Sequence, residues 1–134
     1  DYVIGADIAM GLSGGDDSVA YVMDRTTLQY VCRMGGKIEP DRFADMLLEL
    51  AWFYNEAFLL PENNSIGMSV AKKTSAKYVR HGFQMRMDTP GNPNYDWDRP
   101  GWNTNQSNRR EMFAQLRQAV RDLVSRKGID GRTR

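Results

Sequence analysis

The stretch from Tyr2 to Val22 constrains the fold more than any other part of the chain. An apolar run ends in a single carboxylate, Asp7, and a glycine-rich turn then leads into a second apolar run. β-branched and aromatic residues on both sides of a turn that contains Gly14 and Gly15 predict a β-hairpin. We therefore expect Asp7 where the first strand becomes the turn.

A carboxylate at the end of a buried strand needs a compensating partner, because an isolated buried charge costs several kcal/mol. A metal ion, a substrate and backbone N–H groups can each be that partner. Asp7 can equally cap the turn by accepting hydrogen bonds from the amides of residues 9–11. The hairpin alone leaves both roles open.

The rest of the chain predicts an α/β protein whose mixed central sheet is flanked by helices. Three strands with short links form an antiparallel meander, and apolar residues at intervals of three and four predict helices after it. A short, fully apolar run after the first helix predicts a central strand covered on both faces. The elements expected in order are strands 2–7, 18–23 and 28–34, a helix 40–55, a strand 57–60, a helix 66–80, a strand 83–87 and a helix 108–126.

Residues 88–105 hold three of the five prolines and predict a long irregular loop. The single cysteine, Cys32, excludes an internal disulfide and a cysteine-based zinc site, and its apolar surroundings predict a place in the core. The single histidine, His81, excludes a histidine-rich metal site, and we expect it at the surface or at a helix end.

The length of 134 residues fits one domain, residues 1–134. The chain starts on Asp1 without a methionine, as a piece excised from a longer polypeptide would. With no signal peptide and no long apolar stretch, we expect no membrane partner and a cytoplasmic location. Residues 105–134 carry eight basic and three acidic residues, a net charge of +5 (8 − 3) that suits phosphates or a solvated helix face equally.

Two acids occupy corresponding places, because Glu62 follows the fourth strand as Asp7 follows the first. This order of elements and acids resembles ribonuclease H-like folds, in which the first and fourth strands lie side by side. Two neighbouring carboxylates repel unless a cation lies between them, and Mg²⁺ or Mn²⁺ prefers such oxygen ligands. A pair of these ions, about 3.5 to 4 Å apart, can activate water and stabilise the leaving oxygen in phosphodiester cleavage.

Several stretches together resemble the C-terminal nuclease domain of bacteriophage and prophage terminase large subunits, the motors that package viral DNA. The resemblance covers nearly the whole chain, and its most specific part is the order of an Asp-x-Ala-x-Gly motif at the start and Glu-Asn-Asn about half-way. The stretches are Tyr2–Gly11 with Asp16–Val19, Gly36–Ala44, Tyr54–Ala57, Glu62–Asn64, and Gly101–Thr104 leading into Asn108–Met112.

The resemblance implies a two-metal endonuclease that cuts concatemeric double-stranded DNA in the cytoplasm of a bacterial host. On this reading Asp7 and Glu62 are catalytic metal ligands for Mg²⁺ or Mn²⁺, two ions being expected in the complete site, and Asp16 or Asp17 supplies an auxiliary acid or simply turn chemistry. The ATPase domain, the portal and the small terminase subunit are implied as partners. The residues that can contact DNA are Arg109, Arg110, Lys72 and Trp102.

The chain departs from the family pattern in one respect. Such nucleases close the site with a third acid beyond the last helix, and neither Asp122 nor Asp130 matches that motif. We therefore expect a piece truncated before its last acidic motif, with weak or no cleavage by itself. No Gly-x-x-x-x-Gly-Lys-Ser/Thr motif occurs, so ATP hydrolysis would belong to another part of the motor.

Two other classes of function remain open. An actin-like or sugar-kinase phosphate-binding domain also starts with a strand, an Asp and glycines, and Asp130–Thr133 faintly resembles its second phosphate motif. A non-catalytic DNA-binding or docking module would use Tyr95, Trp97 and Trp102 to stack on bases. Nicking that depends on Asp7 separates the enzyme from the module, and nucleotide binding without nicking favours the kinase-like domain.

Overall fold

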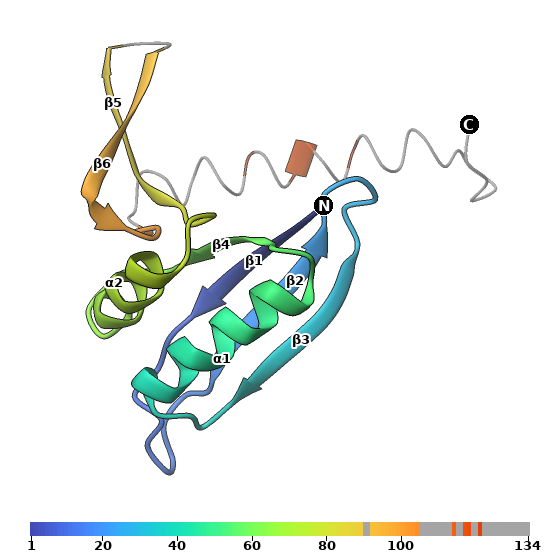
Figure 1. The fold of residues 1–134 in the computed structure, drawn as a ribbon, viewed down its shortest axis with the longest axis vertical. Coiled ribbons are helices and arrows are strands. Elements are labelled where there is room, and N and C mark those ends of the chain that lie inside the picture. The colour runs from blue at the N-terminus through green and yellow to red at the C-terminus, as the bar shows by residue number, and fades with distance from the viewer. Residues whose placement is uncertain (90–91, 105–113, 115–116, 119–120, 122–134) are drawn as a thin grey trace, which may run out of the picture. The chain divides into compact units, whose positions relative to one another are not determined.

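The computed structural model describes residues 1–89, 92–104, 114, 117–118 and 121. Residues 1–103 form one compact unit and residues 104–134 a second. The elements in order are β1 (Tyr2–Asp7), β2 (Ser18–Asp24), β3 (Tyr30–Gly36), α1 (Pro40–Phe53), β4 (Phe58–Pro61), α2 (Gly67–Lys77), β5 (Phe83–Thr89) and β6 (Asn92–Pro100) (Figure 1).

The main sheet has four strands in the order β3-β2-β1-β4. β1 pairs antiparallel with β2, and β2 pairs antiparallel with β3, so the predicted meander is confirmed. β4 pairs in parallel with β1, in a register that sets Val3 opposite Phe58 and Ala6 opposite Pro61. The predicted α/β class, the mixed sheet and the neighbouring first and fourth strands are thus confirmed.

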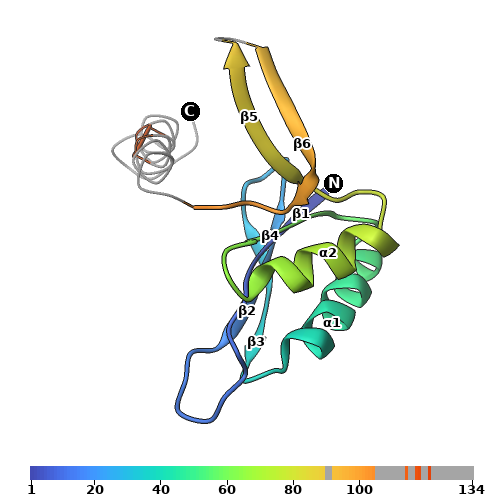
Figure 2. The same ribbon diagram turned by 90° about the vertical axis from the view of Figure 1, so that its left-hand side faces the viewer.

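Both helices of residues 1–103 lie on the same side of this sheet (Figure 2). Pro40 starts α1 in the first turn, where its missing N–H costs nothing. Apolar residues three and four positions apart on α1 then face the sheet, so that Phe43 and Leu47 are fully buried against Ile4 and Leu59. Cys32 is partly buried and packs against this core.

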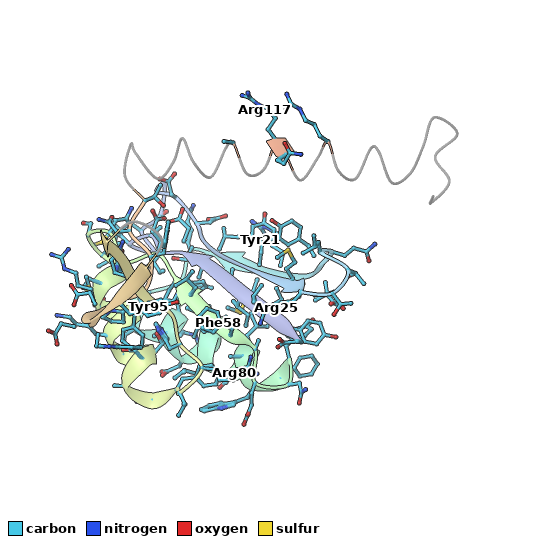
Figure 3. All side chains as sticks on the ribbon, turned by 90° about the horizontal axis from the view of Figure 1, so that it is seen from above. Tyr21, Arg25, Phe58, Arg80, Tyr95 and Arg117 are labelled. Atoms are coloured by element: carbon cyan, nitrogen blue, oxygen red, sulfur yellow. The ribbon has the colours of Figure 1, made fainter. Side chains whose placement is uncertain are left out.

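The opposite face of the sheet is apolar as well. Strand residues that alternate with the core positions line a hollow of about 740 Å³ on this face. Figure 3 labels two of them, Tyr21 and Phe58. The remaining apolar lining residues of β1, β2 and β4 include Val3, Val19, Met23 and Leu60.

Within residues 1–103, β4 is not the doubly covered central strand that its apolar sequence predicts. It lies at the edge of the four-stranded sheet, where Leu59 and Pro61 are buried and Phe58 and Leu60 are half-buried. The difference arises because α1 and α2 lie on one face only. Beyond the β4 edge, two isolated parallel bridges join Leu59 to His81 and Glu62 to Trp102.

The predicted loop at residues 88–105 is wrong for residues 88–89 and 92–100, because they belong to β5 and β6, which pair antiparallel in a sheet of their own. Residues 90–91 and 105 lie outside the described residues. Pro100 is the last residue of β6, where a missing N–H is tolerated. Aromatic residues alternate with aspartates along this strand, so that Tyr95 and Trp97 fall on one face and Asp96 and Asp98 on the other. The prolines obscured this period-two pattern in the sequence.

The predicted surface position of His81 is also wrong, because its side chain is only 5% exposed. Its Nδ1 lies 2.8 Å from the Gly82 carbonyl oxygen and its Nε2 lies 2.8 Å from Thr74 Oγ1. Since a carbonyl only accepts, Nδ1 donates to Gly82, while Nε2 faces the Thr74 hydroxyl, which also lies 2.8 Å from the Val70 carbonyl oxygen. Burial lowers the pKa of His81, and the Gly82 carbonyl opposes this shift only in part.

Candidate functional site

Asp7 and Glu62 stand side by side at one edge of the main sheet. The parallel register ends with Ala6 opposite Pro61, and the Glu62 amide donates to the Ala6 carbonyl over 2.7 Å. Asp7 follows Ala6 and Glu62 follows Pro61, so the two acids come directly after the last pair of this register. Because side chains alternate along a strand, the Asp7 carboxylate points to the face that carries Val3 and Phe58, opposite the helices, and lines the hollow there.

Asp7 differs in exposure from the sequence expectation. Its side chain is exposed, so water relieves the desolvation cost that the apolar sequence of β1 predicts. Asp7 does not cap the turn at Ala9, because the Ala9 amide donates to Ser18 Oγ over 2.8 Å. Among the described residues, no lysine or arginine lies within ion-pair distance of Asp7.

The three residues that follow β4, Glu62, Asn63 and Asn64, have different structural roles. Asn64 Nδ2 donates to Glu62 Oε1 over 3.0 Å, which orients this carboxylate. Asn63 is buried and donates from Nδ2 to the Pro100 carbonyl over 2.8 Å. The Asn63 backbone amide donates to the Trp102 carbonyl. Trp102 and Glu62 form an isolated parallel bridge. The end of β6 thereby fixes the backbone of Glu62.

Gly67, at the start of α2, contacts the other side of this backbone. A Cβ atom at Gly67 would lie 2.1 Å from the Glu62 carbonyl oxygen, closer than any side chain permits. The position therefore requires glycine. Glycine at this position allows α2 to begin directly behind the edge of the sheet where β4 ends and Glu62 follows.

The turn between β1 and β2 adds the other two predicted acids. Residues 8–17 form this turn, and Asp7, Asp16, Asp17 and Asn64 line one hollow of about 430 Å³ with it. Asp17 Oδ1 accepts a hydrogen bond from Lys37 Nζ over 2.9 Å. Asp16 and Asp17 are both exposed. The predicted auxiliary acids thus share a hollow with Asp7, and one of them already has a cationic partner.

The donor atoms at this edge suit a hard divalent cation. Asp7 and Glu62 offer carboxylate oxygens from neighbouring strands, the ligand type that Mg²⁺ and Mn²⁺ prefer. Within the described part of the chain, no three acidic, histidine or cysteine side chains come close enough together to hold a metal ion. Two carboxylates with water ligands are therefore the set that these residues provide.

A second group of acids lies on α1, and one lysine of α2 pairs with both of them. Lys73 of α2 pairs with Asp41 Oδ1 over 2.8 Å and with Asp45 Oδ1 over 3.1 Å. The hydrogen bond from Lys73 lowers the pKa of Asp41, and the hydrogen bonds to Asp41 and Asp45 raise the pKa of Lys73. These acids join the two helices and do not line the hollow beside Asp7.

The predicted DNA contacts are only partly placed. Lys72 is exposed on α2, and Trp102 is half-buried beside Glu62, with an indole Nε1 that has no hydrogen-bond partner among the described residues. Arg109, Arg110, Asp122 and Asp130 lie outside the described residues. Their predicted roles stay predictions.

Sequence reasoning missed Ser18 and Lys37. Ser18 is fully buried and bonds the backbone of Ala9 across the turn. Its polar side chain in an otherwise apolar strand was the available signal. Lys37 follows Gly35 and Gly36 and carries no such signal, because it meets Asp17 only through the fold.

Comparison with known proteins gives no match: no protein-family model matches the sequence, and no curated protein does. None of the helices in the described residues is long and apolar enough to span a membrane.

Proposed function

We propose that this chain is the metal-dependent DNA endonuclease domain of a viral DNA-packaging terminase, with a ribonuclease H-like fold. The observation that carries the proposal is the parallel pairing of β1 with β4, whose last pair, Ala6 and Pro61, directly precedes Asp7 and Glu62. The motifs around these acids, including Glu62–Asn64, support the same family. The strand order β3-β2-β1-β4, with a further parallel bridge beyond β4, is compatible with such a fold.

The residues of the edge have defined tasks on this proposal. Asp7 and Glu62 would hold Mg²⁺ or Mn²⁺, and Asn64 would keep Glu62 Oε1 in place. When bound, a pair of such ions supplies an activated water and a counter-charge for the leaving oxygen. The exposure of Asp7 leaves the edge open to the phosphate backbone of double-stranded DNA, and Lys72 would contribute a phosphate contact. An ATPase domain, a portal and a small terminase subunit would be the partners, in the cytoplasm of a bacterial host.

Nicking of supercoiled plasmid in Mn²⁺ tests the proposal. We expect slow, metal-dependent nicking that Asp7→Asn lowers about 100-fold or more, because a neutral amide is a poor replacement for a metal-ligating carboxylate. Asp41→Asn is the matched control, since it removes an acid that pairs with Lys73 on the helices. Nicking that both variants reduce equally, or that neither reduces, contradicts the assignment.

A DNA-binding module is the second candidate, and the β5–β6 hairpin favours it. Trp97 is 68% exposed and Tyr95 is 46% exposed, with ring centroids 5.5 Å apart, and such exposed rings can stack on bases. DNA binding that Trp97→Ala weakens, without nicking and without any effect of Asp7→Asn, would support this function instead.

A further inference from the structure

The turn formed by residues 8–17 determines what faces Asp7. It carries Asp16 and Asp17, and it lines the hollow that also contains Asp7 and Asn64. Gly15 N donates to the Leu12 carbonyl over 3.0 Å within the turn. A ten-residue turn held only by such local bonds would be mobile, so contacts with the rest of the fold decide where its acids lie.

One such contact is the backbone of residues 37–39, which connects β3 to α1. Gly11 has a φ of +75°, and a Cβ atom there would lie 2.6 Å from the Ile38 carbonyl oxygen. The turn therefore lies directly against this connection at Gly11. Ser18 anchors the other part of the turn by bonding both the amide and the carbonyl of Ala9.

Lys37 supplies the remaining contact. Its Nζ donates to Asp17 Oδ1 over 2.9 Å and also to the Gly15 carbonyl. The second bond reaches the backbone, so Lys37 fixes the course of the turn as well as a side chain. The first bond engages one of the two acids that could join Asp7 as a ligand.

We propose that Lys37 is a positioning residue: it holds the acid-bearing turn against the β3–α1 connection and keeps Asp17 out of the ligand set of the metal site. The metal part rests on the proposed function, whereas the holding of the turn does not. Loss of the Lys37 charge frees the Asp17 carboxylate and makes the hollow more negative. A divalent cation then binds more tightly, while the turn becomes less ordered.

A plain surface ion pair would behave differently. Exposed pairs contribute little to stability, and Lys73 with Asp41 and Asp45 is such a pair elsewhere on the molecule. Lys73→Gln is therefore the matched control for Lys37→Gln, because each change removes one lysine that bonds a carboxylate and a backbone carbonyl. Of these two lysines, only Lys37 contacts the turn that lies beside Asp7.

The experiment compares the full chain with its Lys37→Gln and Lys73→Gln variants by two readouts. Hydrogen exchange measures the Gly15 amide, and we expect Lys37→Gln to speed it about three- to tenfold and Lys73→Gln to leave it unchanged. Calorimetric titration with Mn²⁺ measures metal affinity, which we expect to rise about three- to tenfold in Lys37→Gln only. Adding Asp17→Asn to Lys37→Gln should cancel the rise.

The outcomes separate this inference from the proposed function. Equal Gly15 exchange in the two lysine variants overturns the positioning role. Mn²⁺ binding that requires Asp7 but is the same in both lysine variants overturns the control of Asp17 and leaves the metal site standing. If Asp7→Asn does not weaken Mn²⁺ binding, the proposed metal site is wrong, and the exchange of Gly15 still decides whether Lys37 holds the turn.

Discussion

Two groups of acids on this molecule differ in whether a basic side chain lies close to them. Asp41 and Asp45 share Lys73, which links α1 to α2. Asp7 sits beside Glu62 at the sheet edge, with no lysine or arginine of the described residues in ion-pair distance. In the first group the acids have a cationic partner on the protein, whereas the exposed Asp7 carboxylate is open to a cation from solution. This contrast is why we assign function to the second group.

Positive charge gathers instead at the other end of β1. Arg25 and Arg80, both labelled in Figure 3, contact the Asp1 carboxylate at 3.0 and 3.4 Å. Asp1 precedes the strand and Asp7 ends it. The strand thus carries a paired acid at one end and an acid beside a second acid at the other, which sharpens the contrast.

The largest expected effect comes from Gly67→Ala, which disturbs the Glu62 backbone without changing any acid. The new Cβ meets the Glu62 carbonyl at 2.1 Å, so we expect a loss of about 1 to 3 kcal/mol in the free energy of unfolding. Urea denaturation measures it. Mn²⁺ binding by the remaining folded protein should also weaken, and unchanged stability would show that α2 does not begin as closely behind Glu62 as described.

The next largest effect is the pH dependence of the free energy of unfolding, to which both His81 and the acids contribute. Replacing His81 isolates its share. Burial lowers the pKa of His81 in the folded state, so its contribution is complete above the unfolded pKa near 6.5 and is lost as the pH falls through the folded value. A single proton gives at most about 1.4 kcal/mol per pH unit. We expect the stability of the native chain to fall between pH 7 and pH 5, and the fall to be smaller in His81→Gln. Parallel curves for the two proteins would contradict this.

The smallest effects test the contrast between the two acid groups directly. Asp7→Asn removes an exposed carboxylate that has no ion pair with the described lysines and arginines, so without metal we expect the free energy of unfolding to change by less than about 0.5 kcal/mol. Asp41→Asn removes the negative charge that pairs with Lys73, so we expect stability to fall. Thermal unfolding in a metal-chelating buffer measures both changes. An equal loss of stability in both variants would remove the distinction between the groups.

The sequence predicts the strands that precede Asp7 and Glu62 better than it predicts their surroundings, for physical reasons. The places of Asp7 and Glu62 follow from apolar runs that each end in an acid, and the pairing of β1 with β4 follows from the order of elements. The apolar runs are local patterns, whereas the neighbouring places of the first and fourth strands are what the resemblance to ribonuclease H-like folds implies. The bond between Lys37 and Asp17 joins residues twenty positions apart and depends on how the turn meets the β3–α1 connection, which no local pattern encodes.

The two expectations that the structure corrects, at His81 and at the β5–β6 hairpin, failed for similar reasons. His81 is buried because Thr74 and Gly82 satisfy both ring nitrogens, a tertiary arrangement that a single histidine in the sequence does not signal. The β5–β6 hairpin was hidden by prolines, which suit irregular structure but are also tolerated at the end of a strand, as Pro100 is. In both cases tertiary context overrides a residue's usual preference.

Crystals soaked in Mn²⁺ give the most direct test of the central claim, because anomalous scattering locates the ions without any assay of activity. The account predicts manganese bound between the Asp7 and Glu62 carboxylates, with Asp17 still bonded to Lys37. Manganese that binds elsewhere, or two carboxylates that stay without an ion at saturating Mn²⁺, would contradict the metal site and with it the proposed nuclease.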